Sequence, residues 1–174
     1  MFSRLISGIF GTIGAVSLMQ FPAFFQQYLQ RLGGHLEQAK LDVGRFVEAA
    51  KLQGLDLKTY INRLSENADE TVVGTADAIK GVVDDLDNHQ QAFSALQSSA
   101  IWQQPASFAR WVNSNISTDT FAIFEPSLPL STAGLIYGLI GLILGVSLLS
   151  LIGFSWRLVK NIFKRLHANS LMRA

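Results

Sequence analysis

The chain is poor in several kinds of residue, and each scarcity excludes a class of protein. It contains no cysteine, so neither a disulfide nor a thiolate metal site can stabilise it. Only 16% of its 174 residues are charged, whereas soluble domains carry about 25%. This scarcity of charge, with a hydrophobic content of 49%, excludes a disordered chain, and the net charge of +1 excludes a basic nucleic-acid-binding protein.

The few charges are distributed unevenly. All 13 acidic residues lie between Glu37 and Glu125, where they outnumber seven basic residues. The N-terminal segment carries one base, Arg4, and the C-terminal tail carries five. Residues 5–30 and 126–156 hold no charge at all. A helix needs roughly 20 apolar residues to cross a bilayer, so each uncharged stretch predicts a transmembrane helix.

The basic ends predict the orientation of these two helices, because Lys and Arg collect on the cytoplasmic side of a membrane. We expect an N-terminal transmembrane helix over 1–25, a periplasmic helical domain over 26–128, a second transmembrane helix over 129–156 and a basic amphipathic cytoplasmic tail over 157–174. Both termini are then cytoplasmic, and the localisation is a bacterial inner membrane. The alternative for the N-terminal stretch is a cleaved signal peptide. The tail residues expected to contact anionic lipid, unless they are only a topology signal, are Arg157, Lys160, Lys164 and Arg165.

The middle of the chain has helical periodicity with steps of three and four, which is typical of a coiled-coil seam. The pattern predicts a helix over 21–53 that ends at Gly54, a short helix capped by Asp56, and a returning helix over 72–93. A further short helix follows Pro105, and 115–129 is expected to be a loop. The aromatic segment 101–112 fits either the core or the membrane interface. The predicted seam comprises Leu29, Leu32, Leu36, Val43, Phe46, Val72, Ile79, Val83, Leu86 and Phe93.

The predicted fold class is therefore an all-α membrane protein in which two transmembrane helices flank an antiparallel, coiled-coil-like helical hairpin. Small residues at a spacing of four recur in both uncharged stretches and let helix backbones approach in lipid. They favour packing of the two spans on each other or of one chain on another. These predicted packing residues are Ser7, Gly11, Ala15, Gly134, Gly138, Gly141 and Gly145.

The chain shows little evidence of catalytic chemistry. Neither uncharged stretch contains an Asp, Glu, Lys, Arg or His, which argues against a stand-alone transporter. The sequence has no phosphate-binding, dinucleotide-binding, nucleophile-elbow or zinc-protease motif. Its histidines, His35, His89 and His167, fit no standard metal spacing and are expected on solvated helix faces. We therefore predict no catalytic, cofactor-binding or metal-binding residue and no small-molecule substrate.

The segment QFPAFFQQYLQRLGGHLEQA, residues 20–39, resembles a family of short uncharacterised bacterial inner-membrane proteins that carry a domain of unknown function. The resemblance extends over nearly the full chain. It implies two membrane spans with a helical periplasmic segment between them. Because that family has no assigned activity, the resemblance implies no catalytic residue.

Three functions fit these observations. The first is a non-enzymatic structural, accessory or assembly component whose partners are the lipid bilayer and either a second copy or a larger membrane complex. The second is a membrane sensor or regulator that transmits periplasmic signals, with Gly33 and Gly34 as a hinge. The third is a subunit of a membrane transporter or enzyme complex. The sequence favours the first of these.

Overall fold

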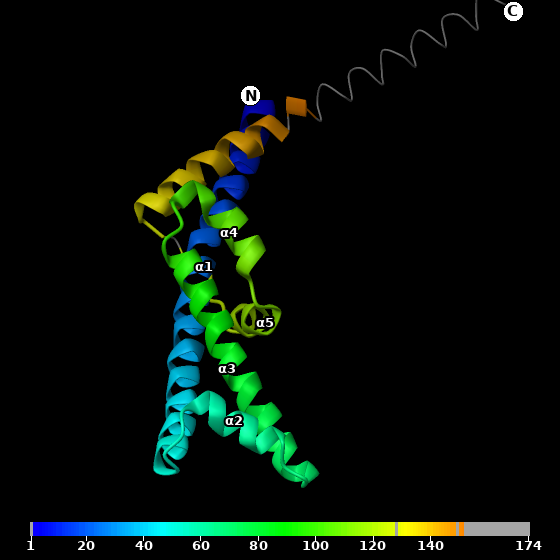
Figure 1. Ribbon diagram of the computed structural model, residues 1–174. Coiled ribbons are helices and arrows are strands. Elements are labelled where there is room, and N and C mark those ends of the chain that lie inside the picture. The colour runs from blue at the N-terminus through cyan, green and yellow to red at the C-terminus, as the bar shows by residue number, and fades with distance from the viewer. Residues whose placement is uncertain (1, 128, 149, 152–174) are drawn as a thin grey trace, which may run out of the picture. The chain divides into compact units, whose positions relative to one another are not determined.

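The computed structural model of the chain describes residues 2–127, 129–148, 150 and 151. Every regular element in this part of the chain is a helix (Figure 1), which confirms the prediction of an all-helical protein. Contacts along the backbone define two compact units. The first comprises Met1–Phe24 with Glu125–Ala174, and the second is Phe25–Phe124. We describe each unit by itself.

Helix α1 (Phe2–Leu52) contributes its first turns to the first unit and the rest to the second. The expected N-terminal span and the expected helix over 21–53 are therefore one continuous helix that includes Pro22. Its portion Ile6–Leu52 is long and apolar enough, by length and composition, to cross a membrane. Gly33 and Gly34 do not interrupt it, although each interior glycine costs a helix about 1 kcal/mol.

The end of α1 is set by Gly54, as the sequence predicts. Gly54 has a φ of +70°, a left-handed conformation that glycine adopts without strain. The N–H of Leu55 donates to the carbonyl of Ala50 at 3.0 Å, and the N–H of Gly54 donates to that of Lys51 at 2.9 Å. This pair of hydrogen bonds is the Schellman motif, which satisfies the last carbonyls of a helix. Asp56 then occupies the N-cap of α2 (Leu57–Ser65).

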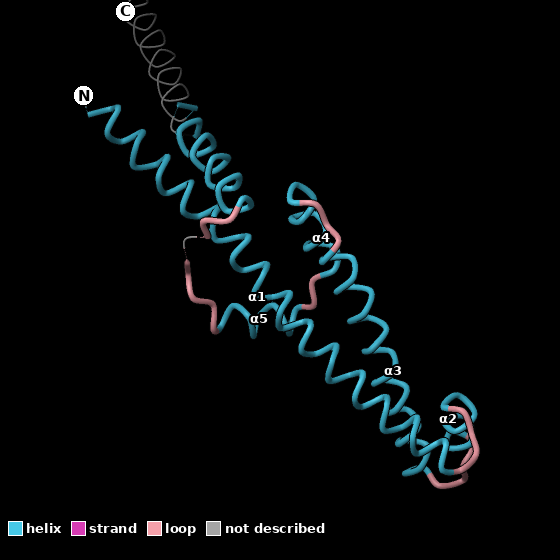
Figure 2. The backbone as a smooth tube through the Cα atoms, turned by 90° about the vertical axis from the view of Figure 1, so that its left-hand side faces the viewer, coloured by secondary structure: helices cyan, strands magenta, loops and turns pink. Residues whose placement is uncertain are grey.

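Helix α3 (Glu70–Gln97) belongs to the second unit, and residues near both of its ends contact α1 (Figures 1 and 2). The Asp69 side chain caps its start by accepting the N–H of Thr71 at 2.9 Å. Near the start of α3, a buried cluster of Ile61, Ala76 and Ile79 joins it to α2, and Phe46 of α1 packs against this cluster. Near the other end, the ring of Phe93 covers Gly33.

The region after α3 contains more helix than the sequence predicts. A 3₁₀ turn (Ile101–Gln103) leads into α4 (Gln104–Trp111), and α5 (Ser114–Ala122) follows. The expectation of a loop over 115–129 is therefore wrong at its start. The Asn113 side chain caps α5 by accepting the N–H groups of Asn115 and Ile116 at 3.0 and 3.2 Å. Buried Ile116 anchors the helix, although its other residues are mostly Ser, Thr and Asn.

The first unit pairs the start of α1 with a second apolar helix, Thr132–Leu148. Ser131 caps this helix, because its hydroxyl accepts the N–H of Gly134 at 3.2 Å and its carbonyl accepts the N–H of Leu135 at 3.0 Å. The final part of the predicted second span, from residue 152 onward, lies outside the described residues.

Candidate functional site

The two helices of the first unit cross through their glycines. A Cβ atom at Gly14 would collide with the carbonyl oxygen of Gly141, and one at Gly141 would collide with the carbonyl oxygen of Gly14. At Gly145 a Cβ would collide with the carbonyl oxygen of Phe10. Backbone therefore lies directly against backbone, which only residues without a side chain permit. We call Gly11, Gly14, Gly138, Gly141 and Gly145 the glycine crossing.

The flanks of the glycine crossing are filled by flexible side chains. A Cβ at Gly11 would lie 3.0 Å from Leu142 Cδ1 and from Val146 Cγ2. A Cβ at Gly138 would lie 2.8 Å from the Cγ and Sδ atoms of Met19. The crossing therefore extends over more than two turns of each helix, from Gly11 to Met19 on one side and from Gly138 to Val146 on the other.

The remaining predicted packing residues have different surroundings. The Cα of Ala15 lies 3.0 Å from where a Cβ of Gly141 would be, and Ser7 is half-buried one turn before Gly11. Gly134 serves the start of its own helix instead, because a Cβ there would collide with the carbonyl oxygen of Pro129. Gly14 lies at the centre of the crossing, outside the predicted stripe of Ser7, Gly11 and Ala15. The sequence signal that could have indicated Gly14 is its spacing of three residues from Gly11, because the predicted stripe used only the spacing of four.

The first unit buries small residues and exposes large apolar ones, which is the reverse of the pattern in a soluble protein. Gly11, Gly138 and Gly141 are buried, whereas Ile13 and Leu139 are 55% and 59% exposed. Fifteen of the twenty large apolar side chains that are exposed among the described residues belong to this unit. A contiguous exposed apolar surface marks a site of contact with a protein or a membrane.

A polar clasp, which no local pattern predicts, joins α1 to the loop that precedes the second apolar helix of the same unit. The Gln20 side-chain amide donates to the carbonyl of Ser127 at 3.1 Å and accepts the N–H of Ser127 at 3.2 Å. Close by in sequence, the rings of Phe21 and Tyr137 lie with their centres 5.4 Å apart. The clasp satisfies backbone groups of a loop, where unpaired groups would be costly away from water.

The predicted seam lies in the second unit, and its residues differ in burial. Leu32, Leu36 and Ile79 are buried, and Phe46 and Val83 pack against the Ile79 cluster. The other seam residues, which are half-buried, are Leu29, Val43, Val72, Leu86 and Phe93. The predicted lipid-contact residues Arg157, Lys160, Lys164 and Arg165 lie outside the described residues.

The aromatic core of the second unit joins α1 to the region after α3. Tyr28 is fully buried, and its ring meets the ring of Phe108 edge-on with centres 5.0 Å apart. The Tyr28 hydroxyl accepts the backbone N–H of Asn113 at 2.9 Å. Burial raises the pKa of the Tyr28 phenol, and the hydrogen bond from Asn113 offsets part of that rise. Of the predicted aromatic segment, half-buried Phe108 thus packs against the core residue Tyr28, whereas Trp102 is 81% exposed.

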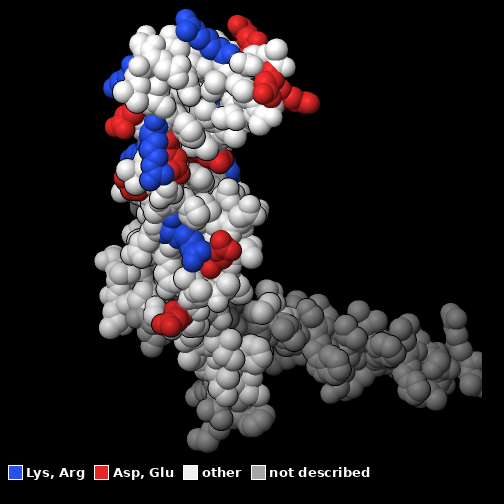
Figure 3. All heavy atoms as spheres, turned by 90° about the horizontal axis from the view of Figure 1, so that it is seen from below, with Lys and Arg blue, Asp and Glu red and all other residues white. Residues whose placement is uncertain are grey.

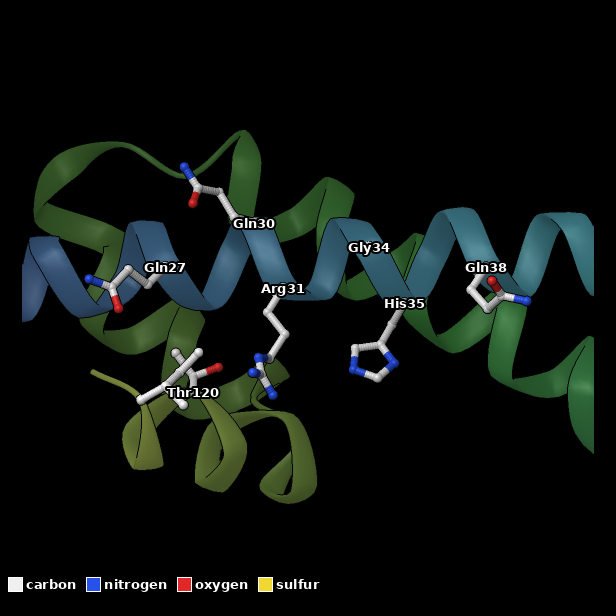
Figure 4. A pocket seen from close by; sticks show the side chains of 8 residues that line it. Gln27, Gln30, Arg31, Gly34, His35, Gln38 and Thr120 are labelled. Atoms are coloured by element: carbon white, nitrogen blue, oxygen red, sulfur yellow. The ribbon is translucent and has the colours of Figure 1, made fainter. Parts of the chain in front are cut away.

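An open groove of about 880 Å³, most of whose lining residues are polar, lies along α1 beside α5 (Figure 4). The Arg31 guanidinium, which lies in this groove, pairs with the Asp119 carboxylate at 3.5 Å. The Gln38 amide at its other end donates to both carboxylate oxygens of Asp42 at 3.0 Å. We call it the amide groove; its polar lining residues are Gln27, Gln30, Arg31, His35, Gln38 and Thr120. Such a lining suits hydrogen bonding to a partner.

Some charged residues of the second unit form ion pairs with a neighbour on the same helix. Lys40 with Glu37, Arg45 with Asp42 and Lys80 with Asp77 are ion pairs three residues apart on one helix face. Figure 3 shows basic and acidic side chains interspersed over the face in view. Such exposed pairs each contribute only a few tenths of a kcal/mol.

Comparison with known proteins identifies the family of the chain. The chain matches the family described as "Protein of unknown function (DUF2937)" over residues 2–161. No curated protein and no solved structure matches it. The expected membership of a family without assigned function is thereby confirmed. Because the match covers nearly the whole chain, the protein belongs to the DUF2937 family of proteins of unknown function.

Proposed function

We propose that the chain is a non-enzymatic integral protein of a bacterial inner membrane that acts as a structural, accessory or assembly component. The first unit is its anchor, formed by two membrane-spanning helices that pack through the glycine crossing. The second unit is an antiparallel helical hairpin displayed on the periplasmic side, with both chain termini in the cytoplasm.

The inverted first unit carries this proposal. An apolar side chain of the size of Leu or Ile loses about 1.5–3 kcal/mol when it remains in water instead of being buried. Fifteen large exposed apolar side chains on one small unit would therefore be strongly unfavourable in water. In the hydrocarbon of a bilayer, the same side chains have no such free-energy cost. Helix association there depends instead on close backbone contact between small residues. Large residues outside and glycine inside is the arrangement that a bilayer favours.

The surface of the second unit supports the part of the proposal that concerns a partner. The charged groups of the amide groove and its rim are neutralised within the unit, as the Arg31–Asp119 pair illustrates. What remains on the surface is a groove whose lining combines polar side chains such as Gln27 and Gln30 with the exposed apolar side chain of Ile123. We expect a protein partner, either a second copy or a larger membrane complex.

The test is crosslinking in intact cells followed by purification of the full chain in mild detergent. A photoreactive residue replaces Gln30 in the amide groove, and a matched control carries it at exposed Asp87 on α3. We expect a crosslinked species of higher mass from position 30 and a purified particle larger than one chain. A lone monomer with no crosslink at either position would contradict the structural role. Release of the chain from membranes by alkaline carbonate would contradict the anchor itself.

A further inference from the structure

The second unit brings together two histidines that are 54 positions apart in the sequence. His35 on α1 and His89 on α3 lie with their ring centres 5.9 Å apart and their ring planes inclined by 32°. Sequence periodicity does not pair them, because each was expected on a solvated face of its own helix. From this juxtaposition we propose that His35 and His89 form a two-imidazole binding site for a first-row transition metal ion such as Zn²⁺ or Cu²⁺.

The distance between the rings fits a shared ion. Imidazole nitrogen binds such ions at ~2.0–2.1 Å, so two rings that share one ion have centres roughly 5 Å apart in a tetrahedral arrangement and roughly 6 Å apart in a linear one. The observed 5.9 Å lies within this interval. Imidazole is also a ligand that Zn²⁺, Cu²⁺ and Ni²⁺ all accept.

A second observation, independent of the ring distance, supports a ligand at His89. The Nδ1 atom of His89 is buried and has no hydrogen-bond partner among the described residues. A neutral imidazole carries one donor and one acceptor nitrogen, and a buried one without a partner is costly. A bound metal ion uses the lone pair of such a nitrogen.

An ion can reach this pair from solvent. His35 is exposed and lines the amide groove, and Figure 4 shows its ring extending from α1 beside Arg31 and Gln38. The positive charge of Arg31, one turn before His35, is paired with Asp119. No third His, Asp or Glu completes the group in the described part of the chain, so water fills the other coordination positions. Binding should therefore be weaker than at a four-ligand structural zinc site.

Such an ion would link α1 to α3 and stabilise their pairing. A ligand that binds only the folded state stabilises it in proportion to the logarithm of its concentration over Kd. At a ~100-fold excess of Zn²⁺ over Kd, the melting temperature of a chain of this length should rise by roughly 5–10 °C.

The test uses the full chain without an affinity tag, treated with chelator and titrated with Zn²⁺ by calorimetry in detergent. We expect one ion per chain, with affinity at least tenfold weaker and the rise in melting temperature lost in His35→Ala. His167→Ala is the matched control, because His167 is the remaining histidine, and it should bind as the native chain does. Since His35 is exposed on a helix, its loss should leave the helical circular dichroism unchanged.

Cu²⁺ electron paramagnetic resonance gives a readout that stability does not affect. The native chain should show coupling to two nitrogens, and His35→Ala and His89→Gln should each show coupling to one. Equal Zn²⁺ affinity in the native chain and His35→Ala would overturn the proposal, as would a native chain that binds no Zn²⁺ at millimolar concentration. Either result would mean that the two rings only pack against each other.

Discussion

At the scale of single residues, Tyr28 makes a testable contact, because its side chain is fully buried and its hydroxyl pairs with a backbone group 85 residues away. The Tyr28→Phe substitution keeps the ring against Phe108 and removes only the acceptor. The partly buried N–H of Asn113 is then unpaired, which costs about 1–2 kcal/mol. We expect the free energy of unfolding to fall by that amount in chemical denaturation. The same change at Tyr60, whose ring packs on the Ile79 cluster, is the control and should have a smaller effect.

The same variant has an expected pH dependence. Burial raises the pKa of the Tyr28 phenol above its value in the unfolded chain. The unfolded state therefore loses the proton first, and stability that is fully present below about pH 10 is lost as pH rises further. Tyr28→Phe lacks this group, so its unfolding free energy should decrease less steeply above pH 10 than that of the native chain. Parallel slopes in the two proteins would contradict this assignment.

Residue identity alone could predict some of these contacts and not others. Leu32, Leu36 and Ile79 are buried as their periodicity indicates, because burial on a helix follows the helical repeat. The Tyr28–Asn113 bond and the Gln20–Ser127 clasp join residues 85 and 107 positions apart. A periodic pattern contains no information on such distances. The pairing of His35 with His89 was missed for the same reason.

At the scale of elements, local chemistry predicted where helices end better than where short ones occur. Gly54 and Asp56 mark the end of α1 and the start of α2 as expected, because their backbone preferences act locally. Helix α5 was missed since its Ser, Thr and Asn residues are typical of loops. The start of α5 depends on the Asn113 cap, which is visible in the sequence. Its position in the unit depends on the burial of Ile116, which the sequence does not reveal.

The glycine crossing leads to a prediction about the pairing of two helices. Gly14→Leu places a side chain against the backbone of Gly141 and Gly145, where neither helix can yield without separating. Overpacking of this kind costs about 1–3 kcal/mol, and we expect a corresponding loss of thermal stability in detergent. Gly8→Leu is the matched control, because a Cβ at Gly8 has no neighbouring atom within 4 Å. If both variants melt at the same temperature, the crossing does not hold the unit together.

At the scale of the whole molecule, the unequal distribution of charge predicts how the proposed membrane protein is oriented. The acids and most bases lie between Arg31 and Glu125, and five further bases follow residue 156. Basic flanks remain on the cytoplasmic side, so the second unit should be periplasmic and Ala174 cytoplasmic.

The absence of cysteine makes this orientation directly testable, since one introduced thiol is then the only reactive one. Asp87→Cys places that thiol on an exposed position of α3, and a cysteine added after Ala174 places it at the C-terminus. With a maleimide that cannot cross the inner membrane, Asp87→Cys should be labelled in cells whose outer membrane is permeabilised. The C-terminal cysteine should be labelled only after the inner membrane is lysed. Labelling of the C-terminal cysteine before lysis would reverse the proposed orientation, because basic residues would then lie on the side that they normally avoid.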